Sequence, residues 1–268
     1  MAKDLKGVLP FSLAFLAAAI ALSFSTFKRN AVWEKATVLW ADAVRKSPDK
    51  ARPHYNYAVV LAEEGRLEEA LQENLKAVDI YPGYAKAYFN IGAIYHARGD
   101  VERAIPLYKQ TIALRYDIPE AHNNLGYAYY SKGLYDEALK EFGAAIKIKP
   151  RHAKAYVNRG YVFRDTERPE LAEEEFREAI KADPAYAEAY GELGYVLLRR
   201  EKAEEAALNF TEAVRLKPSL AYAYNGLGMA YEMQGLLDRA AEGYRKALSI
   251  NPDYREAGDN LRRVSNRR

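Results

Sequence analysis

The side chains that most often carry catalysis or bind metals are few in this sequence, and they are scattered along it. Cysteine is absent, which excludes a thiolate nucleophile, a disulfide framework and zinc-finger spacing. The four histidines do not cluster as metal ligands would: they are His54, His96, His122 and His152. We therefore expect no metal site, no cofactor and no enzymatic activity.

Two glycines in an otherwise helical stretch are the next candidates for chemistry. In "NNLGYAYYSKGLYDEALKEF", residues 123 to 142, Gly126 and Gly133 interrupt a sequence rich in helix formers. A glycine inside a helix costs about 1 kcal/mol relative to alanine. Either a catalytic loop or a very close approach of two backbones could justify that cost.

A frame of 34 residues decides between these two explanations. It recurs without insertion from residue 51 to residue 254 and fills six repeats. Small residues hold the eighth and twentieth places of each repeat. At the eighth place stand Ala58, Gly92, Gly126, Gly160, Gly194 and Gly228, and at the twentieth Ala70, Ala104, Ala138, Ala172, Ala206 and Ala240.

Large apolar residues and prolines recur in the same frame, which predicts two amphipathic helices per repeat. The twenty-fourth place is aromatic in five repeats, and Asn74 replaces the aromatic in the first. Proline ends the second helix in five repeats, because it cannot continue a helix. A catalytic loop would not recur six times, so the glycines are architectural.

This pattern resembles the tetratricopeptide repeat (TPR), with its W-x2-L-G-x2-Y…A-x3-F…P signature and 34-residue period. The resemblance implies an all-α, right-handed superhelical TPR solenoid. The six repeats are 51–84, 85–118, 119–152, 153–186, 187–220 and 221–254. The flanks, residues 31–50 and 255–268, resemble half-repeats that would cap the apolar ends of the stack.

Within this frame the glycines acquire specific roles. Gly126 and Ala138 should let the two helices of one repeat approach closely. Gly133 should end the first helix in a left-handed conformation. Glu167 and Glu201 replace that turn glycine in the fourth and fifth repeats, so their turns should be strained or differently shaped.

The first thirty residues, 1–30, contain an apolar run that predicts an anchor. Residues 7–27 carry no charge, and as a helix they would span roughly 30 Å, close to the apolar thickness of a bilayer. We expect a single transmembrane helix; a cleaved signal peptide and a buried core helix are the alternatives. The Lys/Arg balance on the two sides does not settle the orientation.

The charge distribution argues against nucleic acid as a partner. The whole chain has a formal net charge of +3, with the excess of basic residues at its two ends. Residues 53–254 carry 31 acidic and 26 basic side chains, so the repeats present no basic stripe for phosphates.

The resemblance implies that the first helices line a concave groove. Asparagines at the sixth place could hold the backbone of an extended peptide. Similar asparagine ladders line the superhelix of O-GlcNAc transferases. Aromatic residues at neighbouring places would add contact surface. The candidate binding residues are Asn56, Asn90, Asn124, Asn158, Tyr55, Phe89, Asn123, Tyr127, Tyr130, Tyr161, Tyr195 and Tyr222. Generic repeat asparagines and aromatics that only pack between helices are the alternative explanation.

The carboxylate clamp of chaperone-tail binding repeats is incomplete here. In chaperone-tail binding repeats, the clamp uses Lys and Arg at the second and sixth places of the third repeat. No repeat of this chain has that pair; Lys154, for example, is combined with Asn158. We expect no tight capture of a free C-terminal carboxylate.

Residues 27–56 resemble the junction in membrane proteins with C-terminal TPR domains, including O-mannosyltransferases. That resemblance implies repeats on the non-cytoplasmic (periplasmic) side and brings no catalytic residue. We predict a non-catalytic, membrane-anchored scaffold whose partner is a protein, either an extended peptide segment or a subunit of a membrane complex. An accessory module of a membrane glycosyltransferase and a homo-oligomeric structural protein are the alternatives.

Overall fold

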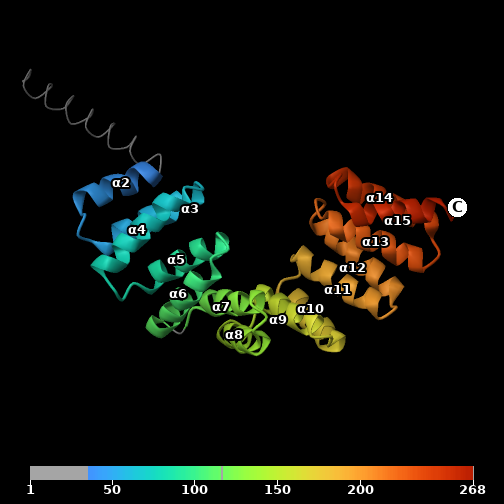
Figure 1. The fold of residues 1–268 in the computed structure, drawn as a ribbon, viewed down its shortest axis with the longest axis horizontal. Helices are drawn as coiled ribbons and strands as arrows, with labels where there is room; N and C mark the ends of the chain where they lie inside the picture. Colours follow the sequence, from blue (N-terminus) through green and yellow to red (C-terminus); the bar gives the residue numbers. More distant parts are fainter. Residues whose placement is uncertain (1–35, 116, 268) are drawn as a thin grey trace, which may run out of the picture. The chain divides into compact units, whose positions relative to one another are not determined.

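The computed structural model describes residues 36–115 and 117–267, and all its regular elements in these ranges are helices (Figure 1). They form two compact units, divided between Asp100 and Val101. Unit 1 contains α2 (Ala36–Lys46), α3 (Ala51–Glu63), α4 (Leu67–Ile80) and α5 (Ala85–Ala97). Unit 2 contains α6 (Val101–Leu114), α7 (Pro119–Ser131), α8 (Tyr135–Ile148), α9 (Ala153–Asp165), α10 (Pro169–Ala182), α11 (Ala187–Arg199), α12 (Ala203–Leu216), α13 (Ala221–Met233), α14 (Leu237–Ile250) and α15 (Arg255–Ser265).

The helix boundaries follow the 34-residue frame. The first helices, α3, α5, α7, α9, α11 and α13, begin at residues 51, 85, 119, 153, 187 and 221. Where a proline closes the second helix, the helix ends two residues before it, as α8 does before Pro150. Proline marks the stop in these five repeats, where it disfavours continuation of the helix. Helix α6 ends at the same place of the frame without such a proline, so the repeat packing also sets the boundary.

The small residues allow the helix pairs to pack tightly. Every alanine at the twentieth place is fully buried. A Cβ added to Gly126 would lie 2.7 Å from the Phe142 ring and 3.2 Å from the Ala138 carbonyl oxygen. The prediction that Gly126 and Ala138 permit a close approach of α7 and α8 is confirmed.

The turns between the two helices of a repeat share one backbone conformation. Gly133 has a φ of 71°, which confirms the predicted left-handed turn. Glu167 and Glu201, which replace the glycine, keep the same conformation with φ values of 57° and 58°. These two turns are therefore strained and not reshaped, because a Cβ is disfavoured in the left-handed region.

In unit 2 the first helices lie closer together than the second helices. α7 contacts α9, α11 contacts α13, and α13 contacts α15. Among the described residues of unit 2, no comparable contact joins two consecutive second helices. The first helices therefore line the shorter, concave side of this unit, and we call that side the first-helix face.

Helix α15 covers the C-terminal end of unit 2. Ala257 and Val264 are fully buried against the stack. Arg263 and Arg267 place guanidinium nitrogens 2.8 Å and 3.0 Å from the carboxylate oxygens of Glu232 on α13. Burial of these apolar side chains lets α15 cover the helices of the sixth repeat.

The membrane location expected from residues 7–27 is corrected by the structure. The longest described helices have 14 residues, and none is long and apolar enough to cross a bilayer. Fourteen residues rise only about 21 Å, whereas the apolar layer is about 30 Å thick. Residues 7–27 themselves lie outside the described residues. We therefore do not retain the single-pass anchor or the assignment to a non-cytoplasmic side.

Candidate protein-binding surface

Tyrosines form a continuous run on the first-helix face of unit 2. Tyr127 and Tyr130, on α7, have ring centroids 5.8 Å apart. Tyr130 in turn stacks on Tyr161 of α9, with centroids 6.4 Å apart and an interplanar angle of 28°. Tyr127 is 41% exposed, while Tyr130 and Tyr161 are partly buried. The run connects two successive repeats and offers aromatic surface at low entropic cost.

A charged cluster holds the two inner tyrosines in place. The Tyr130 hydroxyl donates to Asp165 at 2.5 Å, and the Tyr161 hydroxyl donates to Glu192 at 3.4 Å. Arg164 lies over the Tyr161 ring, 4.8 Å from its centroid, and donates to Glu192 at 2.9 Å. The cluster therefore fixes the ring orientations, which lowers the entropy that a ligand must remove.

The two phenols of this cluster are not suited to acid–base chemistry near neutral pH. Burial and the Asp165 carboxylate raise the pKa of the Tyr130 phenol to about 12. Burial also raises the pKa of Tyr161 above its usual value. The pKa of Glu192 is raised by burial, although Arg164 opposes the shift. The phenols thus stay protonated and act as hydrogen-bond donors and contact surface.

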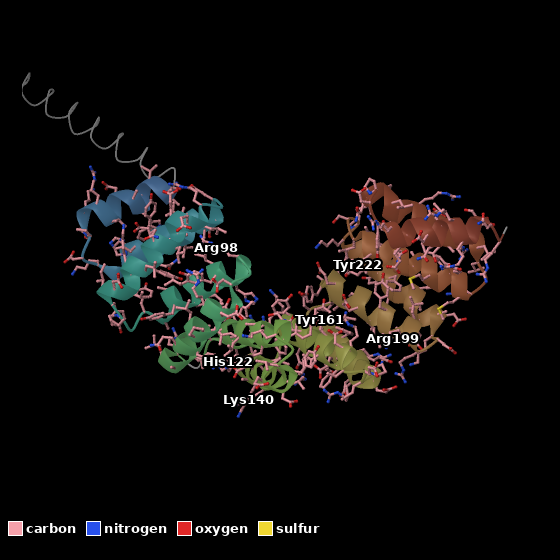
Figure 2. All side chains as sticks on the ribbon, in the orientation of Figure 1. Arg98, His122, Lys140, Tyr161, Arg199 and Tyr222 are labelled. Atoms are coloured by element: carbon pink, nitrogen blue, oxygen red, sulfur yellow. The ribbon has the colours of Figure 1, made fainter. Side chains whose placement is uncertain are left out.

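A second pair of tyrosines lies further along unit 2. Tyr195 of α11 and Tyr222 of α13 stack with centroids 6.2 Å apart, and the Tyr195 hydroxyl donates to the Tyr222 carbonyl oxygen at 2.8 Å. Figure 2 marks Tyr161 on α9 and Tyr222 on α13. Gly191 allows this arrangement, since a Cβ there would lie 2.8 Å from the Tyr222 ring.

The predicted asparagine ladder is partly used within the protein. Asn158 is buried and donates to Asn123 at 2.8 Å, so neither side chain is fully available to a ligand. The Asn124 amide, which is partly buried, hydrogen-bonds Tyr108.

A matching asparagine pair was not predicted: Asn260 donates to Asn225 at 3.0 Å. Both pairs join the fifth place of one repeat to the sixth place of the next. An offset of 35 residues between two asparagines is the sequence signal that could have revealed them.

The remaining predicted residues lie in unit 1 and are all partly buried: Tyr55, Asn56, Phe89 and Asn90. Tyr55 packs on Tyr84 with ring centroids 5.0 Å apart. Asn90 hydrogen-bonds the Tyr55 hydroxyl, which again links the fifth and sixth places of adjacent repeats. These four residues belong to unit 1, whereas the tyrosine run belongs to unit 2.

His54, His122 and His152 each lie against a structural partner. His54 lies 2.5 Å from a Glu73 carboxylate oxygen, and His122 lies 2.7 Å from one of Glu141. His152 accepts a hydrogen bond from the backbone N–H of Ala155 at the start of α9. No group of His, Cys, Asp and Glu in residues 36–115 and 117–267 could hold a metal ion.

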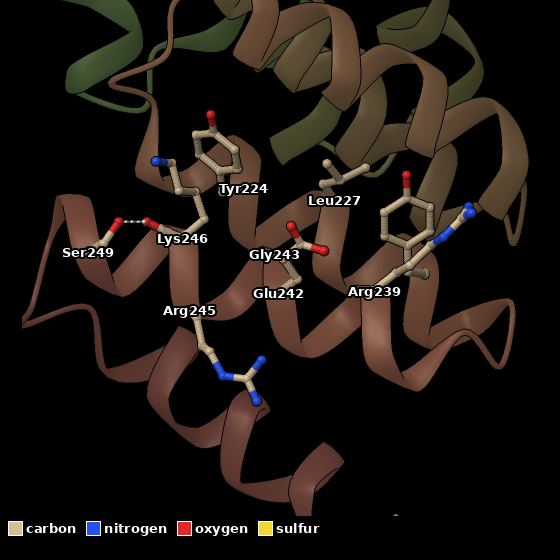
Figure 3. Close-up of a pocket in the computed structure, with 9 residues that line it drawn as sticks. Tyr224, Leu227, Arg239, Glu242, Gly243, Arg245, Lys246 and Ser249 are labelled. Atoms are coloured by element: carbon tan, nitrogen blue, oxygen red, sulfur yellow. Dashed lines mark hydrogen bonds between the residues drawn. The ribbon is translucent and has the colours of Figure 1, made fainter.

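A pocket of about 620 Å³ lies in unit 2 where α13 meets α14 (Figure 3). It is lined by Tyr224 and Leu227 at the fourth and seventh places, and by residues of α14 such as Gly243. The fifth repeat has a similar notch at the same places, with Tyr190 and Leu193. A hollow that recurs with the repeat is a consequence of the helix packing.

Comparison with known families agrees with this geometry. Sequence models of the tetratricopeptide repeat match residues 49–117, 89–153, 132–187, 157–221 and 221–254, more than three quarters of the chain together. The chain belongs to the tetratricopeptide repeat family. The TPR resemblance and the all-α solenoid fold are thus confirmed.

Solved TPR structures share the fold. A chain of the APC/C hetero-tetramer Cut9–Hcn1 superposes with a TM-score of 0.75 at 17% identity, over 86% of this chain and 46% of that one. YrrB, described as a TPR protein with an unusual peptide-binding site, gives a TM-score of 0.54 at 25% identity, over 69% of this chain and 95% of that one. At 17% identity the first likeness shows only the fold.

A sequence relative matches a much smaller part of this chain. The protein O-mannosyl-transferase TMTC1 of Homo sapiens is 37% identical over 60 residues, 22% of this chain and 7% of that protein. The chain thus spans less than a tenth of the length of this curated relative.

Proposed function

We propose that this TPR protein is a non-catalytic scaffold that binds an extended segment of a partner protein on the first-helix face of unit 2. The observation that carries the proposal is the tyrosine run from Tyr127 through Tyr130 to Tyr161. It combines an exposed ring with two rings that are already fixed by hydrogen bonds. Rigid aromatic surface of this kind is typical of binding hot spots.

The repeat spacing favours an extended ligand. Tyr127, Tyr161 and Tyr195 hold the ninth place in three successive repeats, so similar contacts recur along the stack. A segment that follows the stack would meet one tyrosine per repeat. The peptide-binding site named for YrrB supports this mode of recognition.

A protein partner also agrees with the charge of the repeats. Residues 53–254 carry more acidic than basic side chains, which does not favour a polyanion. The similarity to TMTC1 supplies no catalytic residue, and we propose no transferase activity. The homo-oligomer considered from the sequence stays an untested alternative.

The proposal is tested by a variant that removes two side chains of the first-helix face. Because the Asn124 amide also bonds buried Tyr108, Tyr127→Ala alone is measured beside it. In Tyr127→Ala combined with Asn124→Ala, we expect recovery of partner proteins from a lysate of the source cells to fall at least tenfold. Because Tyr127 is the most exposed ring of the run, circular dichroism should show an unchanged helix content. Leu208→Ala is the matched control, since Leu208 is a 71% exposed apolar residue on second helix α12.

Unchanged recovery with the double variant, or an equal loss with Leu208→Ala, would refute binding on the first-helix face. Docking along an edge of the solenoid would then be the remaining mode.

A further inference from the structure

Unit 1 contains a pocket of about 390 Å³ between α3 and α5. Its lining includes residues at the sixth and ninth places, which the TPR resemblance assigns to the concave side. Its walls are mainly apolar, with Val59 and Ala62 from α3 and Ala93 and Ile94 from α5. Two amides also line it, Asn74 of α4 and Asn90 of α5. It differs from the two pockets described in unit 2 because a residue at the twenty-fourth place, Asn74, lines it.

The pocket occurs where the first repeat lacks an aromatic ring. In the other five repeats the twenty-fourth residue is a fully buried aromatic: Tyr108, Phe142, Phe176, Phe210 and Tyr244. The Phe210 ring lies within 2.8 Å of a Cβ built on Gly194 and within 2.3 Å of one built on Gly226. These glycines are the eighth place of the same repeat and the sixth of the next.

The corresponding neighbours of Asn74 are Ala58 and Asn90, and Asn90 does line the pocket. Replacing a ring by the smaller asparagine therefore leaves space at a position that the fold normally fills.

The Asn74 side chain leaves one hydrogen-bonding atom without a partner. Only 1% of the residue is exposed, and its Nδ2 donates to the Ala70 carbonyl oxygen at 2.9 Å. That bond fixes the orientation of the amide, because a flipped amide would set two oxygens against each other. Its Oδ1 is buried and accepts no hydrogen bond. An unsatisfied buried acceptor costs about 1–3 kcal/mol, so the pocket favours a guest that supplies a donor.

A guest that suits the pocket has a flat apolar body and a donor at its tip. The second repeat shows such a group at the equivalent place, where Tyr108 is buried and its hydroxyl is bonded to the Asn124 amide of the next repeat. Asn90 holds the same sixth place beside the pocket. A phenol therefore matches the missing ring in size, and its hydroxyl can donate a hydrogen bond to the unpaired Oδ1 of Asn74.

We propose that unit 1 binds a tyrosine side chain of a partner protein in this pocket. The phenol ring packs against Val59 and Ile94, and its hydroxyl enters first and donates to Asn74 Oδ1. The proposal assumes that the protein binds other proteins. It uses residues distinct from the tyrosine run of unit 2, so each site can be tested without the other.

The probe is p-cresol, which reproduces the tyrosine side chain, and toluene is its isosteric control without the donor. In NMR titrations of the isotope-labelled full chain, we expect p-cresol to shift the Asn74 side-chain amide and the Ile94 methyl resonances. Toluene should bind at least about fivefold more weakly, since it forms no hydrogen bond. Equal binding of the two probes, or p-cresol shifts confined to other residues, would overturn the proposal.

Variants assign the binding to Asn74. Asn74→Phe combined with Ala58→Gly restores the glycine and aromatic pair of the other repeats and should abolish the p-cresol shifts; Asn74→Phe alone is made beside it. Asn209→Phe is the control, because Asn209 also donates to the carbonyl oxygen four residues earlier, at 2.8 Å, but lies at the twenty-third place. Should Asn74→Phe fold poorly, Ala93→Tyr narrows the pocket from a partly exposed position and should weaken binding.

Retention of p-cresol binding in a folded Asn74→Phe protein would contradict the proposal. The Tyr127→Ala, Asn124→Ala protein should bind p-cresol as the unchanged chain does. This comparison distinguishes loss of partner binding on the first-helix face of unit 2 from loss of p-cresol binding in the pocket of unit 1.

Discussion

At the scale of the residue, the glycines differ in what surrounds them. Gly126 faces the Phe142 ring so closely that a Cβ would lie 2.7 Å from it, whereas a Cβ on Gly143 of α8 would meet nothing within 4 Å. Gly126→Ala should therefore destabilise the protein by about 1–3 kcal/mol through overpacking. Gly143→Ala should stabilise it by about 0.5–1 kcal/mol, because alanine is the better helix former.

Urea unfolding followed by circular dichroism measures both changes. The two substitutions add the same methyl group to neighbouring helices of one repeat, so each is the control for the other. Equal effects of the two would show that Gly126 is tolerated for reasons other than close packing.

The same scale shows what could be predicted from the sequence. The places of Gly126, Ala138 and Gly133 follow from the repeat, because their roles depend on backbone geometry that every repeat shares. The use of Asn158 does not follow, because it depends on the neighbouring repeat offering Asn123 at the right place. The sequence shows only that Asn74 departs from the aromatic pattern of the twenty-fourth place. The pocket and the unpaired Oδ1 atom depend on the packing of neighbouring helices, which residue types do not determine.

At the scale of the element, the docking of α15 should depend on pH. Arg263 donates to Glu232 and thereby lowers the pKa of that carboxyl below its ordinary value of 4.5, with a further contribution from Tyr244. A carboxyl whose pKa is lowered by folding stabilises the folded state above its unfolded pKa. This contribution is lost as the pH falls through the lowered value.

The variant Arg263→Gln tests this dependence. At pH 7 it should lower the free energy of unfolding by about 0.5–1 kcal/mol, the range for a partly exposed ion pair. The difference from the unchanged chain should shrink as the pH falls below about 4.5. Arg262→Gln, which removes only the exposed pair with Asp259 on the same helix, should show a smaller effect. A difference that stays constant from pH 7 to pH 3 would contradict this account.

Helix boundaries were the most predictable feature at this scale, because proline and the left-handed turn act locally. The left-handed φ of Glu167 and Glu201 shows that the packing of the helices on either side imposes the turn even without glycine. Whether such a turn is strained or reshaped could not be decided from the residue types alone.

At the scale of the whole molecule, the TPR frame aligns the first helices of successive repeats into a continuous face in unit 2. The same frame separates the histidines along the sequence. His54 and His122 each pair with a glutamate, and Tyr130 keeps its proton because its pKa is raised to about 12. The aromatic run on the first-helix face of unit 2 joins two successive repeats through direct ring contacts. Its partner could not be predicted from the sequence, because ring positions identify a surface and not the segment that binds it.

Site-specific photocrosslinking tests the central claim most directly. A p-benzoylphenylalanine replaces Tyr127 in one version of the full chain and Leu208 in another, and crosslinked peptides are mapped by mass spectrometry. We predict that position 127 crosslinks to one contiguous segment of a partner protein and that position 208 does not. Crosslinks to partners from position 208 alone, or none from position 127, would contradict the account.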